Sequence, residues 1–594
     1  MVSVTNSDIR DVFDQIADLL EFQGGNVFRV RAYRNAAHTI GTMVESLATI
    51  LRDDKQSLTD LEGIGADLAA KIKILINTGG LPLLDELKAK TPAVVFDLMR
   101  VPGLGPKKVK VLIEELHIDS LDALEQACRD ERVCSIKGFG KKTESLILEN
   151  IAFAKSIEHD RILWEEADVI VQQLLSWMRK CPATHQAEGA GSWRRGKETV
   201  GDIDILIDSN DAPAVMDHLQ SWRECSDVLL RGETKTSIRG PRGIQVDLRV
   251  VEHDSFGSAW QYFTGSKDHN VRLRSRAREK NLTINEYGVF QLVTGVDTNA
   301  KPVKGDVIAG STESDVYKAV GLPWIPPELR EGTDEITKSE KGDMPELVGL
   351  DDICGDLHMH TNATDGEAAL GDMVQAAIQR GLSYIAITDH SQRVTMANGL
   401  NAKRLLNQWG EIDRLNETFR KEGHPAITVL KGIEVDILEK GGLDLPDAVL
   451  MQADWVVASL HYGQHQSRDR ITKRIIEAIE NPAVSVIGHP TGRLINRRQA
   501  YDVDMEAIIA AAAQTGTFLE INANPWRLDL NVQNALAAKK SGVKMVISTD
   551  AHSEHGLDVM RCGVLQARRA SLEKKDVVNT NSLSNLRKMM KPRS

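Results

Sequence analysis

The sequence is poor in cysteine and contains no long apolar run. Its six cysteines are scattered and form no Cys-x-x-Cys pair, which is typical of reduced, mostly buried thiols in a cytoplasmic protein. No apolar stretch approaches the length that would cross a bilayer, and residues 1–6 are too polar for a secretion signal. We therefore expect a cytoplasmic protein with no membrane partner.

Length and charge restrict the class of protein. A chain of 594 residues is too long for one hydrophobic core, so about three to five folding units are expected. The formal net charge of −12 argues mildly against nucleic-acid binding. That charge is an average over the whole chain, however, whereas the basic surface of a DNA-binding protein is local. In addition, a bound metal ion neutralises the charge of the acids that ligate it.

An acidic strand at 202–207 is the first feature that indicates chemistry. Alternate residues of a strand share a face, so Asp202 and Asp204 project together while Ile203 and Ile205 point into the core. Two carboxylates held so close repel each other unless a divalent cation lies between them. An isolated Asp-x-Asp is more often a solvated strand edge, so further features are needed.

Two further features make the solvated edge the weaker alternative. A Gly-Ser turn and two arginines, Arg194 and Arg195, precede the strand and can hold an anion such as a triphosphate. A second alternating strand, 245–251, carries Asp247, and pairing it beside the first would bring a third acid to the same cations. Together these features predict a metal-dependent phosphoryl-transfer site.

A glycine motif occurs three times before this strand, each time followed by a helical pattern. Its glycines permit a tight turn, so the amides that open the next helix can face a phosphate. This resembles the helix-hairpin-helix, which binds the DNA backbone without reading sequence. The expected DNA-binding residues are Gly63, Gly65, Gly103, Gly105, Lys107, Lys108, Gly138, Gly140 and Lys141.

With Tyr-Phe-Thr-Gly-Ser at 262–266, these blocks resemble a family X DNA polymerase over residues 1–320. The resemblance implies that Asp202, Asp204 and Asp247 hold two Mg²⁺ ions. It also implies a binding site for dNTPs formed by Gly191, Ser192, Arg195, Tyr262, Phe263, Gly265, Asn270 and Arg274. On its own, the aromatic pair before a basic helix would be core beside a solvated face.

The same resemblance places a lyase lysine, which forms a Schiff base with an abasic sugar, at Lys71. The chain departs from the family at two positions. Asp67 stands where an assisting lysine is expected, and Gln245 stands where some members have an arginine before the third acid. The first departure bears on lyase activity and the second on how the primer 3′-OH is positioned.

Beyond residue 350, histidines and acids recur at the ends of apolar, strand-like runs separated by helical stretches. Such alternation predicts a β/α barrel, whose active site lies at the carboxyl ends of its strands. A single histidine at a strand end is most often a hydrogen-bonded core residue, but five such strand ends make that explanation remote. Ligation by His, Asp and Glu without cysteine suits Zn²⁺, Mn²⁺ or Fe²⁺.

This segment resembles a PHP (polymerase and histidinol phosphatase) domain. The resemblance implies up to three metal ions, Mn²⁺ or Zn²⁺, and Arg493 is a candidate phosphate clamp with a surface arginine as the alternative. All nine ligand positions of the family have a match: His358, His360, Asp365, His390, Glu434, His461, His489, Asp550 and His552.

The expected fold is multidomain, with helical DNA-binding domains, an α+β nucleotidyltransferase and a distorted β/α barrel. The expected domains are two helical DNA-binding units (1–85 and 86–155), a palm (156–262), a thumb (263–320), a proline-stiffened linker (321–349) and the PHP domain (350–594).

The sequence thus predicts a monomeric DNA-repair enzyme that fills short gaps and degrades single-stranded 3′ ends. The barrel is expected to act as a 3′–5′ exonuclease, with trimming of blocked 3′ ends or cleavage at abasic sites as further activities. Two alternatives stay open at this point. One is a DNA-binding scaffold with vestigial sites, and the other is a barrel that hydrolyses small phosphate monoesters.

Overall fold

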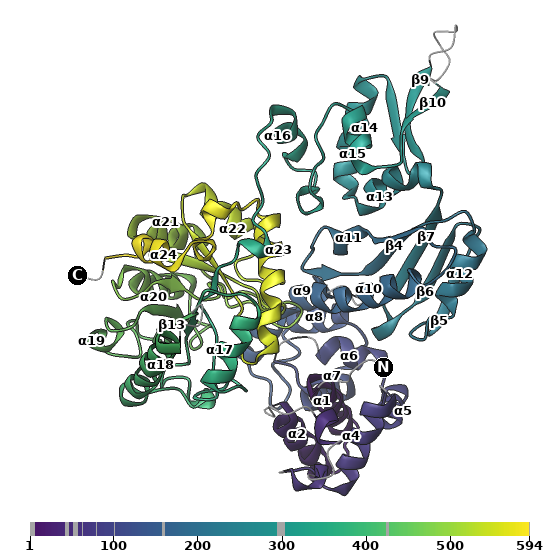
Figure 1. The fold of residues 1–594 in the computed structure, drawn as a ribbon. Helices are drawn as coiled ribbons and strands as arrows, with labels where there is room; N and C mark the ends of the chain where they lie inside the picture. Colours follow the sequence, from purple (N-terminus) through teal and green to yellow (C-terminus); the bar gives the residue numbers. More distant parts are fainter. Residues whose placement is uncertain are drawn as a thin grey trace. The chain divides into compact units, whose positions relative to one another are not determined.

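The structure is a computed structural model that describes residues 6–592 except 42–46, 52–56, 62, 79, 100, 102, 157–160, 294–302 and 423–426. The chain forms two compact units, residues 1–158 with 496–499, and residues 159–495 with 500–594 (Figure 1). Within the described residues, no helix is both long and apolar enough to cross a membrane.

The first unit is helical in its described residues and holds two hydrophobic cores. One core joins α1, α2, α4 and α5 through residues such as Phe13 and Ile72, and the other joins α6 to α9 through residues such as Leu112 and Leu124. The helices are α1 (Asn6–Phe22), α2 (Val27–Gly41), α3 (Leu47–Ile50), η1 (Leu58–Asp60), α4 (Ala66–Thr78), α5 (Pro82–Ala89), α6 (Ala93–Met99), α7 (Pro106–Leu116), α8 (Leu121–Arg129) and α9 (Lys141–Ser156).

The second unit begins with a five-stranded sheet of order β2-β4-β7-β6-β5. Alternate residues of β4 pack on opposite faces, Ile203 and Ile205 against α10 and α12, and Leu206 against α13. The elements are β1 (Ile162–Leu163), α10 (Trp164–Met178), β2 (Gln186–Gly189), α11 (Gly191–Arg194), β3 (Thr199–Val200), β4 (Asp202–Asp208), α12 (Ala212–Gln220), β5 (Asp227–Arg231), β6 (Lys235–Arg239), η2 (Pro241–Gly243), β7 (Gln245–Val251), η3 (His253–Ser255) and α13 (Phe256–Thr264).

A smaller antiparallel sheet, β10-β9-β8, follows and packs with α14 and α15. Its elements are α14 (Lys267–Glu279), β8 (Leu282–Asn285), β9 (Gly288–Val293), β10 (Val303–Ala309), α15 (Glu313–Ala319), η4 (Pro327–Leu329) and α16 (Glu335–Lys341). The expected linker 321–349 is largely packed structure, since Ile325 and Arg330 are fully buried against this subdomain. The proline content of this segment did not reveal its buried partners.

The C-terminal part is a β/α barrel of seven parallel strands in sequential order, as expected. A parallel bridge between Met359 and Ala551 joins its two edges, and Val578 and Leu586 from the C-terminal segment fill its interior. Its strands are β11 (Gly355–Asp356), β12 (Tyr384–Ile387), β13 (Thr428–Asp436), β14 (Trp455–Ser459), β15 (Val486–Ile487), β16 (Phe518–Asn522) and β17 (Met545–Ser548).

Helices accompany the strands of this barrel: most of them pack apolar side chains against the outer side of the sheet, whereas the last two carry Val578 and Leu586 of the interior. They are η5 (Leu350–Asp352), α17 (Leu370–Gln379), η6 (Thr395–Ala397), α18 (Ala402–Glu422), α19 (Asp447–Leu450), α20 (Arg468–Glu480), α21 (Met505–Thr515), α22 (Val532–Lys540), η7 (His555–Val559), α23 (Met560–Arg569), η8 (Lys574–Asp576), η9 (Val578–Thr580) and α24 (Leu583–Met589).

Candidate active sites

The three acids of the first site come together through the pairing of two neighbouring strands. β4 and β7 run parallel with Asp204 opposite Asp247, and Asp202 lies two residues earlier on the same face. This is the strand pairing that the sequence predicted. Gly191 adopts φ +63°, and a Cβ there would lie 2.2 Å from Asp204 Oδ2, so only glycine lets the turn approach this carboxylate.

Charge and burial act differently on the three carboxyls. Burial, with the charges of Asp202 and Asp247, raises the pKa of Asp204 to about 7. Burial also works to raise the pKa of Asp247, but hydrogen bonds from Lys235 (2.7 Å) and Gln245 (2.9 Å) outweigh it and lower that pKa. A divalent cation would replace the proton on Asp204 and relieve the repulsion, so the donor set fits such an ion.

A cleft of about 570 Å³ opens beside the acids and contains all eight residues expected to bind the nucleotide. The hydroxyl of Ser192 is buried there without a hydrogen-bond partner, as expected of a group that waits for a ligand oxygen. The cleft is lined by Arg161, Gly191, Ser192, Arg195, Lys197, Asp202, Asp204, Tyr262, Phe263, Gly265, Ser266, Lys267, Asn270 and Arg274.

Two of these residues make contacts that the sequence did not indicate. Asn270 donates to the carbonyl of Tyr262 and accepts from Gln261, both at 2.8 Å, so its side chain is already oriented. Arg195 donates to the carbonyl of Thr264 and lies 3.4 Å from Glu331. The backbone carbonyl of Thr264, beside the aromatic pair, therefore holds the Arg195 side chain in place.

A buried charge network behind the cleft was missed by sequence reasoning. Glu313 accepts two hydrogen bonds of 2.7 Å from Arg194 and two, of 2.7 and 3.2 Å, from Arg330. Trp324 donates a fifth at 2.9 Å. No local sequence pattern indicates this network, because Arg194 lies more than 100 positions before the other members and meets them only in the folded chain.

The barrel brings together all nine residues that were expected to hold metal ions. Their ligand atoms form three overlapping groups in which the atoms lie within 4.8 Å of one another. The groups are His360, Asp365, His390 and His552; His358, His360 and Asp550; and His390, Glu434 and His461. The ninth residue, His489, lies 3.1 Å from Glu434 through its Nε2.

Several ligand atoms in this cluster have no hydrogen-bond partner although they are buried. Polar atoms are rarely left in that state in a folded protein unless they bind something. The unpartnered atoms include His358 Nε2, His360 Nδ1 and His489 Nδ1. Mixed imidazole and carboxylate donors without sulfur fit divalent metal ions.

Acids outside the cluster orient its histidines. His358 Nδ1 lies 2.7 Å from Glu520, and His461 Nδ1 lies 3.0 Å from Asp436, which leaves the opposite ring nitrogens free to ligate. Sequence reasoning missed both acids. They lie within the strands β16 and β13, and the only signal was a charged residue in an otherwise apolar run.

The cluster drives the pKa values of neighbouring imidazoles apart. Burial, together with the nearby His552 and His390, lowers the pKa of His360 to about 4. Burial would also lower that of His390, but the carboxylates of Glu434 and Asp365 outweigh it and raise the pKa to about 10. Opposed shifts of this kind are typical of sites that bind a cation or transfer protons.

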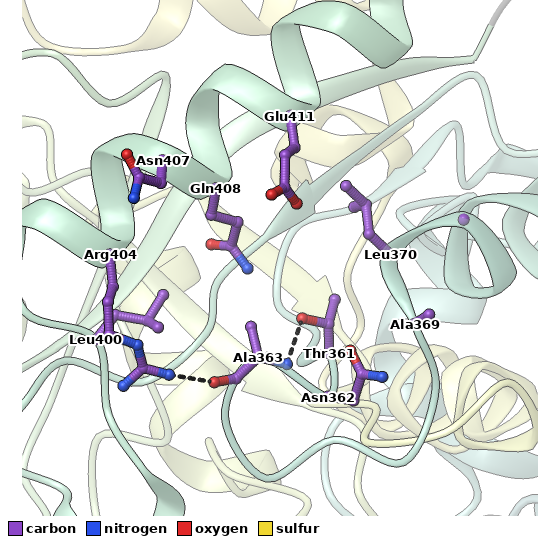
Figure 2. A pocket seen from close by; sticks show the side chains of 11 residues that line it. Thr361, Asn362, Ala363, Ala369, Leu370, Leu400, Arg404, Asn407, Gln408 and Glu411 are labelled. Atoms are coloured by element: carbon purple, nitrogen blue, oxygen red, sulfur yellow. Dashed lines mark hydrogen bonds between the residues drawn. The ribbon is translucent and has the colours of Figure 1, made fainter.

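A pocket of about 380 Å³ adjoins the cluster, between the loop after β11 and the helices α17 and α18. Figure 2 shows Gln408 and Glu411 reaching from α18 toward the loop that holds Thr361, Asn362 and Ala363. Hydrogen bonds connect the wall of this pocket to residues next to the expected metal ligands. Thr361 directly follows His360, and both Thr361 and Gln408 donate to Asp389, at 2.6 Å each, directly before His390.

Arg493 makes a different contact from the phosphate that was expected of it. Its guanidinium donates to both carboxylate oxygens of Glu198 (2.7 and 3.1 Å) and to the carbonyls of Arg527 and Leu528. These acceptors engage all three nitrogens of the guanidinium. Arg527, which the sequence did not single out, lies 3.5 Å from Asp550.

The three glycine motifs have the expected turn geometry. Gly63, Gly103 and Gly138 have φ of +78°, +90° and +98°, which favours glycine. Helices α4, α7 and α9 each begin directly after the second glycine, at positions 66, 106 and 141. A Cβ on any of these second glycines, at 65, 105 and 140, would meet nothing within 4 Å, so the turns leave space for another molecule.

The lysines around these motifs differ in exposure and in the groups that they contact. Lys107 and Lys141 are about four-fifths exposed, whereas Lys108 donates to the carbonyl of Gly103 at 2.9 Å. Lys71, the expected lyase residue, is ion-paired with Asp67 and lies 6.0 Å from the centre of the Tyr33 ring. Its role stays a prediction.

Models of known families match successive segments of the chain, and their order agrees with the order of the folded parts described above. They are a helix-hairpin-helix domain (4–81), a tandem helix-hairpin-helix (95–152), the DNA polymerase beta palm (161–233), the DNA polymerase beta thumb (259–331) and the PHP domain (356–524). Fold and sites thus define a nucleotidyltransferase of the polymerase beta type joined to a PHP domain.

Similarity over the full length of the chain then identifies the family within this class. The chain is 38% identical over 586 residues to the DNA polymerase/3′-5′ exonuclease PolX of Bacillus subtilis (strain 168), covering 98% of this chain and 99% of the relative. It therefore belongs to the family X DNA polymerases that carry a PHP domain, as its motifs predicted.

Partial relatives cover the two halves separately. A probable phosphatase of Thermoanaerobacter sp. (strain X514) is 32% identical over 239 residues, 38% of this chain and 90% of the relative. DNA polymerase lambda of Rattus norvegicus is 24% identical over 344 residues, 55% of this chain and 56% of the relative.

Proposed function

We propose that the chain is a cytoplasmic, monomeric DNA-repair enzyme that fills gaps and resects 3′ ends. The palm would add dNTPs to a primer at short gaps, and the barrel would act as a 3′–5′ exonuclease on single-stranded ends. The observation that carries this proposal is that two separate ligand sets converge in one chain, whose similarity to a polymerase/exonuclease extends from end to end.

In the palm, the chain's own residues bind and align the reactants. Asp202, Asp204 and Asp247 would hold two Mg²⁺ ions, and Ser192 with Arg195 would bind the triphosphate. When bound, such ions lower the pKa of the 3′-OH and stabilise the departing pyrophosphate. The buried network behind Arg194 keeps the turn in place, so that the α-phosphate meets the 3′-OH in line.

In the barrel, the nine clustered residues would hold up to three Mn²⁺ or Zn²⁺ ions. When bound, they lower the pKa of a water molecule and neutralise the phosphoryl oxygens that it attacks. Glu520 and Asp436 fix the ring orientations of His358 and His461, so the site is formed before substrate arrives. Arg527 lies close enough to Asp550 to contact a phosphate held there.

The pocket of Figure 2 would receive the base of the terminal nucleotide. Its volume lies within the range of small-ligand sites, and Leu370 and Leu400 offer apolar surface for a flat ring. Asn362 and Asn407 offer amides to the ring edge. Filling the pocket with Leu370→Trp should therefore raise the KM for an oligonucleotide but not for a small phosphate ester cleaved at the same metal ions.

Two substitutions test the two-site proposal. Asp202→Ala should abolish primer extension and leave 3′–5′ degradation intact, whereas His360→Ala should do the reverse. The matched controls are Asp227→Ala, at an exposed acid of the same sheet, and His465→Ala, at an exposed histidine of the barrel. Loss of both activities through one of the first two substitutions, with the fold intact by circular dichroism, would show that the sites are not independent.

A second candidate function for the barrel is hydrolysis of small phosphate monoesters. The observation in its favour is the similarity of this half to a probable phosphatase. Hydrolysis of histidinol phosphate and of a single-stranded oligonucleotide should be compared at equal metal concentration. Faster turnover of the monoester would favour the second candidate and leave the polymerase proposal unchanged.

A further inference from the structure

The triphosphate turn of the palm is held in place by side chains of the barrel. We call residues 191–198, from the start of α11 to the residue before β3, the triphosphate turn. It contains Ser192 and Arg195, which line the nucleotide cleft. Barrel residues contact the middle and the end of the turn directly. A further barrel residue contacts Asp168, which accepts a hydrogen bond from Trp193 of the turn.

At the end of the turn, Glu198 is fixed by two barrel residues. Arg493 donates to both of its oxygens, at 2.7 and 3.1 Å, and Gln566 donates to one of them at 2.8 Å. Paired guanidinium donors on one carboxylate fix direction as well as distance, which a single contact does not. The Arg493 side chain is mostly buried, so water does not screen the pair strongly.

In the middle of the turn, the backbone packs directly against α23 of the barrel. A Cβ on Gly196 would lie 2.4 Å from Leu565 Cγ and 2.7 Å from both of its methyl groups. These three atoms of one barrel residue are the nearest neighbours of that position. The glycine is therefore required by the barrel side chain as well as by its φ of +66°.

Near the start of the turn, Trp193 is held through α10. Its ring nitrogen donates to Asp168 at 3.1 Å, and the other oxygen of Asp168 accepts from Arg561. Trp164 stacks on Trp193 and donates to its carbonyl at 2.8 Å. Arg561 and Leu565 are four residues apart, so one face of α23 makes both contacts.

None of these contacts is made by a residue of the metal cluster. We propose that Arg493 and Arg561 are positioning residues for nucleotide addition, and that the barrel thereby completes the nucleotide site of the palm. This inference rests on the proposed polymerase function. It assigns the two arginines to the polymerase reaction, although both belong to the exonuclease domain.

The test uses the full-length protein with Glu198→Gln, Arg493→Met and Arg561→Gln, each alone, and with Arg380→Gln as the control. Arg380 forms a comparable ion pair with Asp558 at 2.8 Å, entirely within the barrel. For the first three variants we expect the KM for dNTP to rise about tenfold with kcat changed by less than twofold. Arg493→Lys should recover part of the loss, and Glu198→Gln with Arg493→Met should be no worse than either alone.

A binding measurement separates this inference from the polymerase proposal. Trp193 lies within the turn, so quenching of tryptophan fluorescence by a dNTP, on gapped DNA whose primer lacks the 3′-OH, reports binding without turnover. A wild-type protein that binds dNTP without extending primers would refute the polymerase proposal alone. If the dissociation constants of Glu198→Gln and Arg561→Gln stay within twofold of that of Arg380→Gln, the positioning role is refuted. If Arg493→Met does not fold, those two variants decide the question.

Discussion

Replacing Glu313 by glutamine should destabilise the thumb by several kcal/mol. Its carboxylate is 4% exposed and lies between Arg194 and Arg330, the second of which is fully buried. Glutamine keeps the shape but removes the charge, so two guanidinium groups lose their counter-ion. Breaking a buried ion pair in this way costs about 3–5 kcal/mol.

The pKa of Glu313 supplies an independent estimate of the same quantity. Burial alone would raise this pKa, but Arg330 and Arg194 outweigh it and lower the pKa from 4.5 to about 2. At 1.36 kcal/mol per pH unit, this shift is worth about 3 kcal/mol. Because the folded pKa is the lower one, the stabilisation is fully present above pH 4.5 and is lost as the pH falls toward 2.

Native-state hydrogen exchange of amides in α15 measures this change locally, which matters because a chain with several domains does not unfold in one step. The free energy of opening should fall by about 3 kcal/mol in Glu313→Gln at neutral pH, and the difference from wild type should vanish near pH 2. Glu340→Gln, at an exposed partner of Arg276, should produce no measurable change. A change below 1 kcal/mol in Glu313→Gln, or an equal change in both variants, would refute the reasoning.

Three further predictions follow from the two sites and the glycine motifs. Because the pKa of Asp204 is raised to about 7, Mg²⁺ must displace a proton below that pH. The Mg²⁺ dissociation constant, measured by calorimetry between pH 5.5 and 8, should rise about tenfold per unit below 7, and a flat profile would contradict this. Changing Lys107 and Lys141 to alanine should weaken binding to gapped DNA and reduce the slope of log K against log salt by about 1.8, whereas parallel slopes would exclude phosphate contacts. Lys71 must leave Asp67 before it can attack an abasic sugar, so Asp67→Asn should increase borohydride cross-linking to such DNA, and an unchanged yield would show that the ion pair is irrelevant.

Much of both sites follows from local spacing. Asp202 and Asp204 share a face because a strand repeats every two residues, and the histidines collect at one end of the barrel because parallel strands all end there. The glycine turns were also predictable, since positive φ at Gly63 and Gly103 favours the residue that the motif supplies.

Long-range contacts were not predictable in the same way. Arg493 follows a metal ligand closely in sequence, which suggested a phosphate contact, yet its carboxylate partner lies 295 positions earlier. Residues 321–349 looked like a spacer because of their prolines, yet Arg330 is buried there with Glu313 as its partner. Charge pairing and burial depend on which distant segments meet, and neighbouring residues do not carry that information.

The sequence by itself therefore determined which side chains share a face of a strand or the end of a barrel, because backbone periodicity sets their direction. It also determined the kind of ligand that those side chains suit, because carboxylates and imidazoles are metal donors wherever they gather. Only the tertiary structure decided that Glu198 meets Arg493 and that Gly196 meets Leu565. Both contacts arise where the palm packs against the barrel within one compact unit, and no local pattern encodes that packing.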